Sequence, residues 1–150
     1  MARCARYESS SDVVRPARGP AREERAVLRA GLLDWGGPAS PTDALAAAMG
    51  FTDAAALPSE AWALWKHTDR SSSLTAEDWR RVLLAVEVVF VSDVVGSGLD
   101  WRFTSGFSDA ETIEILRALQ RKLPRWRDSA QFTRGDDGKV TILNQERPRP

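Results

Sequence analysis

The sequence contains very few residues of the types that bind metals or form covalent links. Cys4 is the one cysteine, so the chain cannot form an intramolecular disulfide. His67 is the one histidine, and Asp69 is its only close acidic neighbour in the sequence. A protein metal site needs several histidine, thiolate or carboxylate ligands. We therefore predict no metal site and no cofactor.

The chain also lacks an excess of one charge, a long apolar run and a phosphate-binding loop. It has 21 basic and 21 acidic residues, whereas proteins that bind nucleic acid usually carry a positive excess. No segment reaches the roughly 18 apolar residues of a membrane-spanning helix, and the N-terminal segment has no signal-peptide core. The Gly96-Ser97-Gly98 triplet lacks the preceding strand and the third glycine of a phosphate loop. We expect a cytoplasmic protein without a membrane partner, and nucleic acid is disfavoured as a partner.

The residue patterns predict a mainly α fold, a compact bundle of about five helices with a small C-terminal β-hairpin. Residues 1–19 are predicted to be a disordered N-terminal arm, because serine, proline and arginine are common there and apolar residues are sparse. Residues 20–145 are expected to form a single helical domain of ordinary size. Residues 146–150 are expected to be a frayed tail.

Helix start and stop signals place the five helices at about residues 20–35, 41–49, 58–65, 76–95 and 109–123. The expected caps are Ser40, Thr75 and Ser108, the last two in capping boxes with Asp78 and Glu111. The expected buried stripe of the last helix consists of Ile113, Leu116, Leu119, Gln120 and Leu123. Residues 99–107 are expected to form a connection, and residues 132–143 have the turn signals of a hairpin.

The predicted helix at about 76–95 is apolar on nearly all sides, which indicates a central position in the bundle. Glu87 lies at the boundary between its two apolar sectors, and Asp93 lies inside the larger one. A buried carboxylate needs a partner or takes up a proton, so both are candidate catalytic residues. They lie about 240° apart around the helix and do not share a face. The simpler interpretation is structural: Glu87 pairs with an arginine, and Asp93 binds amides of the Gly96–Gly98 turn.

A basic segment at residues 117–127 is the strongest surface signal. It contains Arg117, Arg121, Lys122, Arg125 and Arg127 without an intervening acidic residue, and Trp126 lies among them. Trp101 also lies outside the helical stripes, and tryptophan is common at the centre of protein interfaces. The predicted partner-binding residues are Arg117, Arg121, Arg125, Trp126 and Trp101. The simpler interpretation is a solvated face at a helix C-terminus.

These features favour a non-catalytic protein-binding module, such as a small cytoplasmic inhibitor or immunity-type partner. The sequence shows no assembled catalytic set, so no catalytic residue is assigned and the partner is expected to be another protein. One alternative is an enzyme that uses Glu87 or Asp93 in a pocket near the Gly96–Trp101 connection. A second alternative is nucleic-acid binding through residues 117–127. No sequence feature indicates an oligomeric state.

Overall fold

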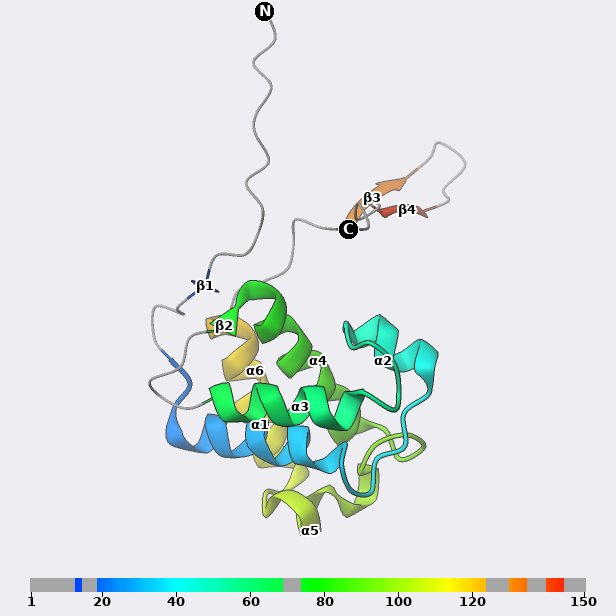
Figure 1. Ribbon diagram of the computed structural model, residues 1–150. Helices are drawn as coiled ribbons and strands as arrows, with labels where there is room; N and C mark the ends of the chain where they lie inside the picture. The colour runs from blue at the N-terminus through cyan, green and yellow to red at the C-terminus, as the bar shows by residue number, and fades with distance from the viewer. Residues whose placement is uncertain (1–12, 15–18, 69–73, 124–129, 135–139, 145–150) are drawn as a thin grey trace, which may run out of the picture.

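The computed structural model describes residues 13–14, 19–68, 74–123, 130–134 and 140–144. Within these residues the chain is mainly helical, as predicted, with six α-helices and one short 3-10 helix (Figure 1). The α-helices are α1 (Arg22–Asp34), α2 (Asp43–Met49), α3 (Leu57–His67), α4 (Ala76–Val91), α5 (Trp101–Ser105) and α6 (Asp109–Lys122), and the 3-10 helix is η1 (Gly98–Asp100). The sequence patterns had predicted a connection where η1 and α5 form.

Two short antiparallel strand pairs accompany the helices. β1 (Val13–Val14) pairs with β2 (Leu74–Thr75), which lies directly before α4. This pairing was not expected from the composition of the N-terminal arm. β3 (Ala130–Arg134) pairs with β4 (Val140–Asn144). The turn between β3 and β4 lies outside the described residues, as do most of the predicted arm and the whole predicted tail, so the C-terminal hairpin stays a prediction.

α1 and α4 each have several helical neighbours. α1 packs against α3, α4, α5 and α6, and α4 packs against α1, α2, α3 and η1. Figure 1 shows α1 and α3 side by side, with α4 and α6 behind them. The predicted central position of α4 is only partly right, because its apolar surface is not covered on all sides. The larger apolar sector of α4 is buried through Val82, Val86 and Val89, but the second sector is only partly covered at Leu84 and Val88 and is exposed at Val91.

α1 and α4 approach each other closely at Gly31. A Cβ atom at this position would lie 2.9 Å from both γ-carbons of Val86, which is closer than nonbonded carbon atoms normally come. One turn further along α1, Trp35 Nε1 donates a hydrogen bond to the carbonyl oxygen of Ala85 at 3.2 Å. The absence of a side chain at Gly31 therefore allows the tight packing of α4 on α1.

α4 ends at Val91, four residues earlier than the predicted end at residue 95. Ser92 has an extended backbone, and its hydroxyl accepts hydrogen bonds from the N–H groups of Val94 at 3.3 Å and Val95 at 3.2 Å. A serine side chain that binds nearby amides offers the backbone an alternative to the helix. Asp93 therefore lies in a turn and not on a helix, which corrects the predicted position of this residue.

The predicted caps of α4 and α6 are confirmed, and that of α2 is wrong. Thr75 accepts a hydrogen bond from the backbone N–H of Asp78 at 3.1 Å, but the Asp78 carboxylate accepts from the Thr75 hydroxyl at 2.9 Å and not from its backbone N–H, so the predicted capping box of α4 is incomplete. Ser108 forms a reciprocal capping box with Glu111. Thr42, not Ser40, caps α2 in the same way at 3.2 Å. The reason is position, because Thr42 directly precedes the first helical residue and Ser40 lies too early to reach the free amides.

Candidate functional site

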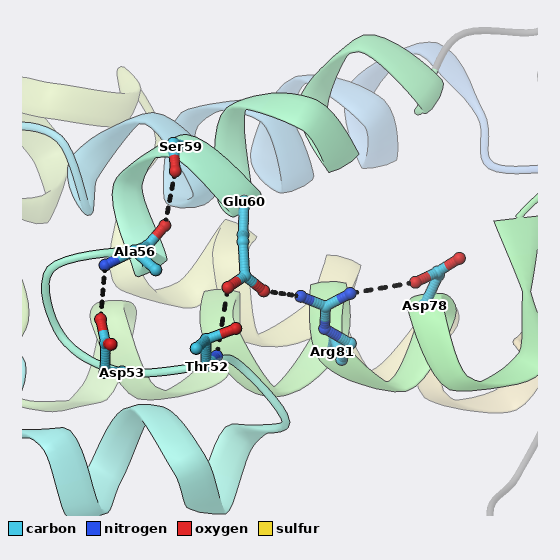
Figure 2. Close-up of polar contacts among 7 residues, drawn as sticks. All are labelled: Thr52, Asp53, Ala56, Ser59, Glu60, Asp78 and Arg81. Carbon is cyan, nitrogen blue, oxygen red and sulfur yellow. Dashed lines mark hydrogen bonds and ion pairs between the residues drawn. The ribbon is translucent and has the colours of Figure 1, made fainter. Parts of the chain in front are cut away.

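A network of charged side chains joins α3 to α4 (Figure 2). Arg81 on α4 donates hydrogen bonds to Glu60 on α3 and, at 3.2 Å, to Asp78. Glu60 Oε1 also accepts a hydrogen bond from the backbone N–H of Thr52 at 3.2 Å. The Arg81 guanidinium lies over the ring of Phe51, 4.6 Å from its centroid. Since each of the three charges has a partner within the fold, we assign this network a structural role.

Asp34, at the end of α1, is a buried carboxylate that the sequence patterns did not single out. Its Oδ2 accepts hydrogen bonds from the hydroxyl of Ser97 and, at 2.7 Å, from that of Thr104. Both Asp34 and Ser97 are buried. These two bonds attach the segment between α4 and α6 to α1. The donors lie 63 and 70 residues away in the chain, so no short-range pattern could have revealed the cluster.

An aromatic stack lies on the surface of α3. The rings of Trp62 and Trp65 are nearly parallel, at 11°, with centroids 4.6 Å apart. Arg29 of α1 covers the Trp65 ring at 3.7 Å from its centroid, and Lys66 Nζ lies 5.7 Å from that of Trp62. Cations of the same chain therefore already occupy the faces of this stack.

The feature best suited to bind something else is an open hollow of about 360 Å³ between α4 and α6, the α4–α6 groove. Its lining residues are Glu87, Phe90 and Val91 from α4 and Ile113, Leu116, Arg117 and Gln120 from α6. Four of these seven side chains are apolar. Among the described residues, Glu87 and Arg117 are the charged groups of the lining.

A short chain of hydrogen bonds connects the polar residues of the groove. Gln120 Nε2 donates to Glu87 Oε1 at 2.6 Å, and Arg117 Nη1 donates to Gln120 Oε1 at 2.8 Å. The predicted pairing of Glu87 with an arginine is therefore indirect, since Gln120 stands between the two charges. Glu87 and Arg117 each keep donor or acceptor capacity that these two bonds do not use.

Two of the apolar groove residues are strongly exposed. Val91 is 76% exposed and Ile113 is 49% exposed, although Ile113 was predicted to lie in the buried stripe of α6. The buried side of α6 is centred on Thr112, Leu116 and Leu119, and Ile113 lies at its edge. The segment that follows α4 exposes three more large apolar side chains, those of Val94, Leu99 and Phe103. Within the described residues, apolar surface is therefore left uncovered both in the groove and on the segment that follows α4.

The two candidate catalytic residues are not brought together. Glu87 lines the groove, whereas Asp93 is exposed beyond the end of α4 and does not line it. Asp93 Oδ1 accepts a hydrogen bond from the backbone N–H of Leu99 at 3.0 Å. The contact resembles the predicted structural role of Asp93, in which it binds amides of the Gly96–Gly98 turn. The bound amide, however, lies one residue beyond that turn. The connection that contains this turn does not line the groove either.

Trp101 is fully buried and cannot contact a partner in this structure. Its Nε1 donates a hydrogen bond to Thr112 Oγ1 at 2.8 Å, and Phe90 packs edge-on against its ring with centroids 5.6 Å apart. The structure therefore places this predicted partner-binding residue in the core and not on the surface. The sequence pattern places Trp101 outside any helical stripe because the pattern does not predict α5, which begins at this residue.

The basic segment is only partly free to bind a partner. Arg117 and Arg121 are exposed on α6, but Lys122 forms a salt bridge with the buried Glu24 at 2.6 Å. Arg125 and Trp126 lie outside the described residues, so their role stays a prediction. Arg117 is the predicted partner-binding residue that the structure places in the groove.

Within the described residues, no group of three or more histidine, cysteine, aspartate or glutamate side chains could hold a metal ion. None of the described helices is long and apolar enough to cross a membrane. Comparisons with protein-family models, curated proteins and solved structures find no match. The case for a function therefore rests on the geometry of the α4–α6 groove.

Proposed function

We propose that the protein is a non-catalytic protein-binding module and that the α4–α6 groove is its docking site. The observation that carries the proposal is the exposure of Val91 and Ile113 beside a mostly apolar hollow. Exposed apolar surface with a polar rim is typical of protein interaction sites. A small cytoplasmic inhibitor or immunity-type partner is one form that such a module takes.

The occupant that fits best is an amphipathic helix that carries carboxylates. A groove between two helices suits the apolar face of a third helix. Arg117 and Arg121 are exposed, lie one turn apart on α6 and form no ion pair among the described residues. Cations at the rim of an apolar groove favour a partner with carboxylates at the matching positions.

The enzyme alternative has less support. Glu87 is a carboxylate in a groove, and a general acid or base must lie within hydrogen-bond reach of a substrate. However, Asp93 lies elsewhere, and the other charged group of the described lining is Arg117, which cannot exchange a proton in this role. Among the described lining residues, Glu87 is therefore the one side chain that could act as a general acid or base.

The nucleic-acid alternative rests on residues 117–127. Lys122 is already paired with Glu24, which leaves Arg117 and Arg121 as the unpaired described cations of the segment. Phosphate binding predicts an affinity that falls linearly with salt on a log–log plot, with the slope reduced by about one for each phosphate-contacting arginine removed. Protein docking in an apolar groove predicts a much weaker salt dependence.

Site-specific photo-crosslinking tests the protein-binding proposal. A photoreactive phenylalanine is placed at Ile113 in the groove or, as a control, at Leu33 on α1, two sites with matched exposures of 49% and 45%. Nuclease-treated extract of the source organism is then irradiated with each protein. We expect discrete protein adducts from position 113 that are absent from position 33 and lost when Val91 is changed to Asp. Identical adduct patterns from the two positions would contradict the proposal.

A further inference from the structure

We propose that the helix that occupies the α4–α6 groove is α6 of a second copy of this chain, in a twofold-symmetric antiparallel pair. This inference rests on the proposed function, because it names the occupant of the same groove. Three observations carry it: the exposed face of α6, the distribution of charge along that face, and the exposed Val91 on the α4 side of the groove.

The α6 outer face consists of Ala110, Ile113, Glu114, Arg117 and Arg121. These positions have the spacing i, i+3, i+4, i+7 and i+11, so they lie along one side of the helix. All five residues are exposed. The proposed occupant is a helix that carries both apolar side chains and carboxylates. The α6 outer face has both, with Ile113 and Glu114 at adjacent positions.

The charges on this face have opposite signs on either side of the helix midpoint. α6 runs from Asp109 to Lys122, so its midpoint lies between residues 115 and 116. Glu114 and Arg117 are equally far from that midpoint. A twofold axis there places Glu114 of each copy opposite Arg117 of the other. An isologous interface of this kind is the usual basis of a protein dimer.

Helix-dipole stabilisation does not explain the central pair. Acidic residues in the first turn and basic residues in the last turn favour a helix by themselves, which accounts for Asp109, Glu111 and Lys122. Glu114 and Arg117 lie beyond those turns, where the dipole effect has faded. Neither forms an ion pair among the described residues, and Arg117 instead donates to Gln120 inside the groove.

The size of the face sets the expected strength of the pair. α6 has 14 residues, so it is about 21 Å long and about 10–12 Å wide, and a single helix face covers on the order of 200–250 Å². A stable interface buries roughly 800 Å² on each partner. α6 alone is therefore too small, and Val91 on the α4 side of the groove must contribute. We expect reversible, concentration-dependent association.

Sedimentation velocity with charge-reversed variants tests the inference. We expect the wild type to show a concentration-dependent sedimentation coefficient. Glu114→Lys and Arg117→Glu should each weaken association at least tenfold, because each reversal places like charges opposite each other twice. An equimolar mixture of the two variants should associate again, because Lys at 114 then faces Glu at 117 and Arg117 faces Glu114. Glu23→Lys, an exposed charge reversal on α1, is the control and should behave as the wild type.

Two results would overturn the inference. One is a wild type that stays monomeric at all concentrations. The other is a mixture of the two folded variants, checked by circular dichroism, that associates no better than either alone. Neither result removes the proposed function, which stands if position 113 still forms adducts with other proteins. Absence of any adduct specific to position 113 removes the proposed function as well.

Discussion

Ser108 and Glu111 close the first turn of α6 by bonding to each other. Glu111 Oε2 accepts from the Ser108 hydroxyl at 2.7 Å and, as the weaker influence on its pKa, from the Ser108 backbone N–H at 2.9 Å. These bonds favour the ionised carboxylate, and they lower the pKa of Glu111 below its ordinary value of 4.5. A depressed pKa in the folded state means that the fold is stabilised when this carboxylate is charged.

The pH dependence of this contribution follows from the direction of the shift. It is fully present above the unfolded pKa of about 4.5 and is lost as the pH falls through the lower folded pKa. We expect Glu111→Gln to have a lower unfolding free energy than the wild type near neutral pH. This difference should shrink as the pH falls, because the wild-type carboxylate then becomes protonated. Urea denaturation of both proteins between about pH 3 and 7 measures this. Glu114→Gln is the control, and a difference for Glu111→Gln that is constant with pH would contradict the account.

The carboxylate of Asp34 is a buried hydrogen-bond acceptor, and its removal should lower the unfolding free energy. Asp34→Ala leaves the buried Ser97 hydroxyl and the Thr104 hydroxyl without their shared acceptor. Each unsatisfied buried group costs about 1–3 kcal/mol. We expect destabilisation in that range, together with faster amide exchange in residues 93–105. Asp34→Asn keeps an acceptor oxygen and should lose less, so equal losses for the two variants would show that hydrogen bonding is not the cause.

At the scale of elements, the two ends of α4 show which signals were predictable. A cap such as Thr75 depends on side chains within one turn, so its signal is local. α4 ends where the Ser92 hydroxyl captures two amides, and the apolar pattern continues past that point. α5 is only five residues long, too short for a periodic pattern. The capping residues therefore predicted where α4 begins, whereas the length of its apolar pattern did not predict where it ends.

The contact of α1 with α4 gives an element-scale prediction. Gly31→Ala places a Cβ atom 2.9 Å from the γ-carbons of Val86, and overpacking of a tight core costs about 1–3 kcal/mol. This should outweigh the roughly 1 kcal/mol by which alanine favours a helix over glycine. Val86→Ala removes both γ-carbons, so Gly31→Ala should be less harmful in that background. A double-mutant cycle by urea denaturation that shows no coupling would contradict the close contact.

At the scale of the whole molecule, the sequence indicated the groove only in part. Glu87 and Arg117 were singled out and do lie in it, but Gln120 was expected in the buried stripe and instead bridges them. The exposure of Ile113 could not be predicted either, because it depends on how far α4 and α6 stand apart. A periodic pattern reports which side of a helix is apolar, and tertiary packing decides how much of that side is covered.

The central claim is that the α4–α6 groove is a protein-docking surface, and isoleucine methyl NMR tests it most directly. The chain has three isoleucines, Ile113, Ile115 and Ile142. Ile113 lines the groove, whereas Ile115 is half-buried on a different side of α6 and serves as the internal reference. The account predicts that the Ile113 signal shifts or broadens as the protein is concentrated, while Ile115 changes much less and Val91→Asp abolishes the response. An Ile113 signal unchanged both across the concentration series and in nuclease-treated extract of the source organism would contradict the claim.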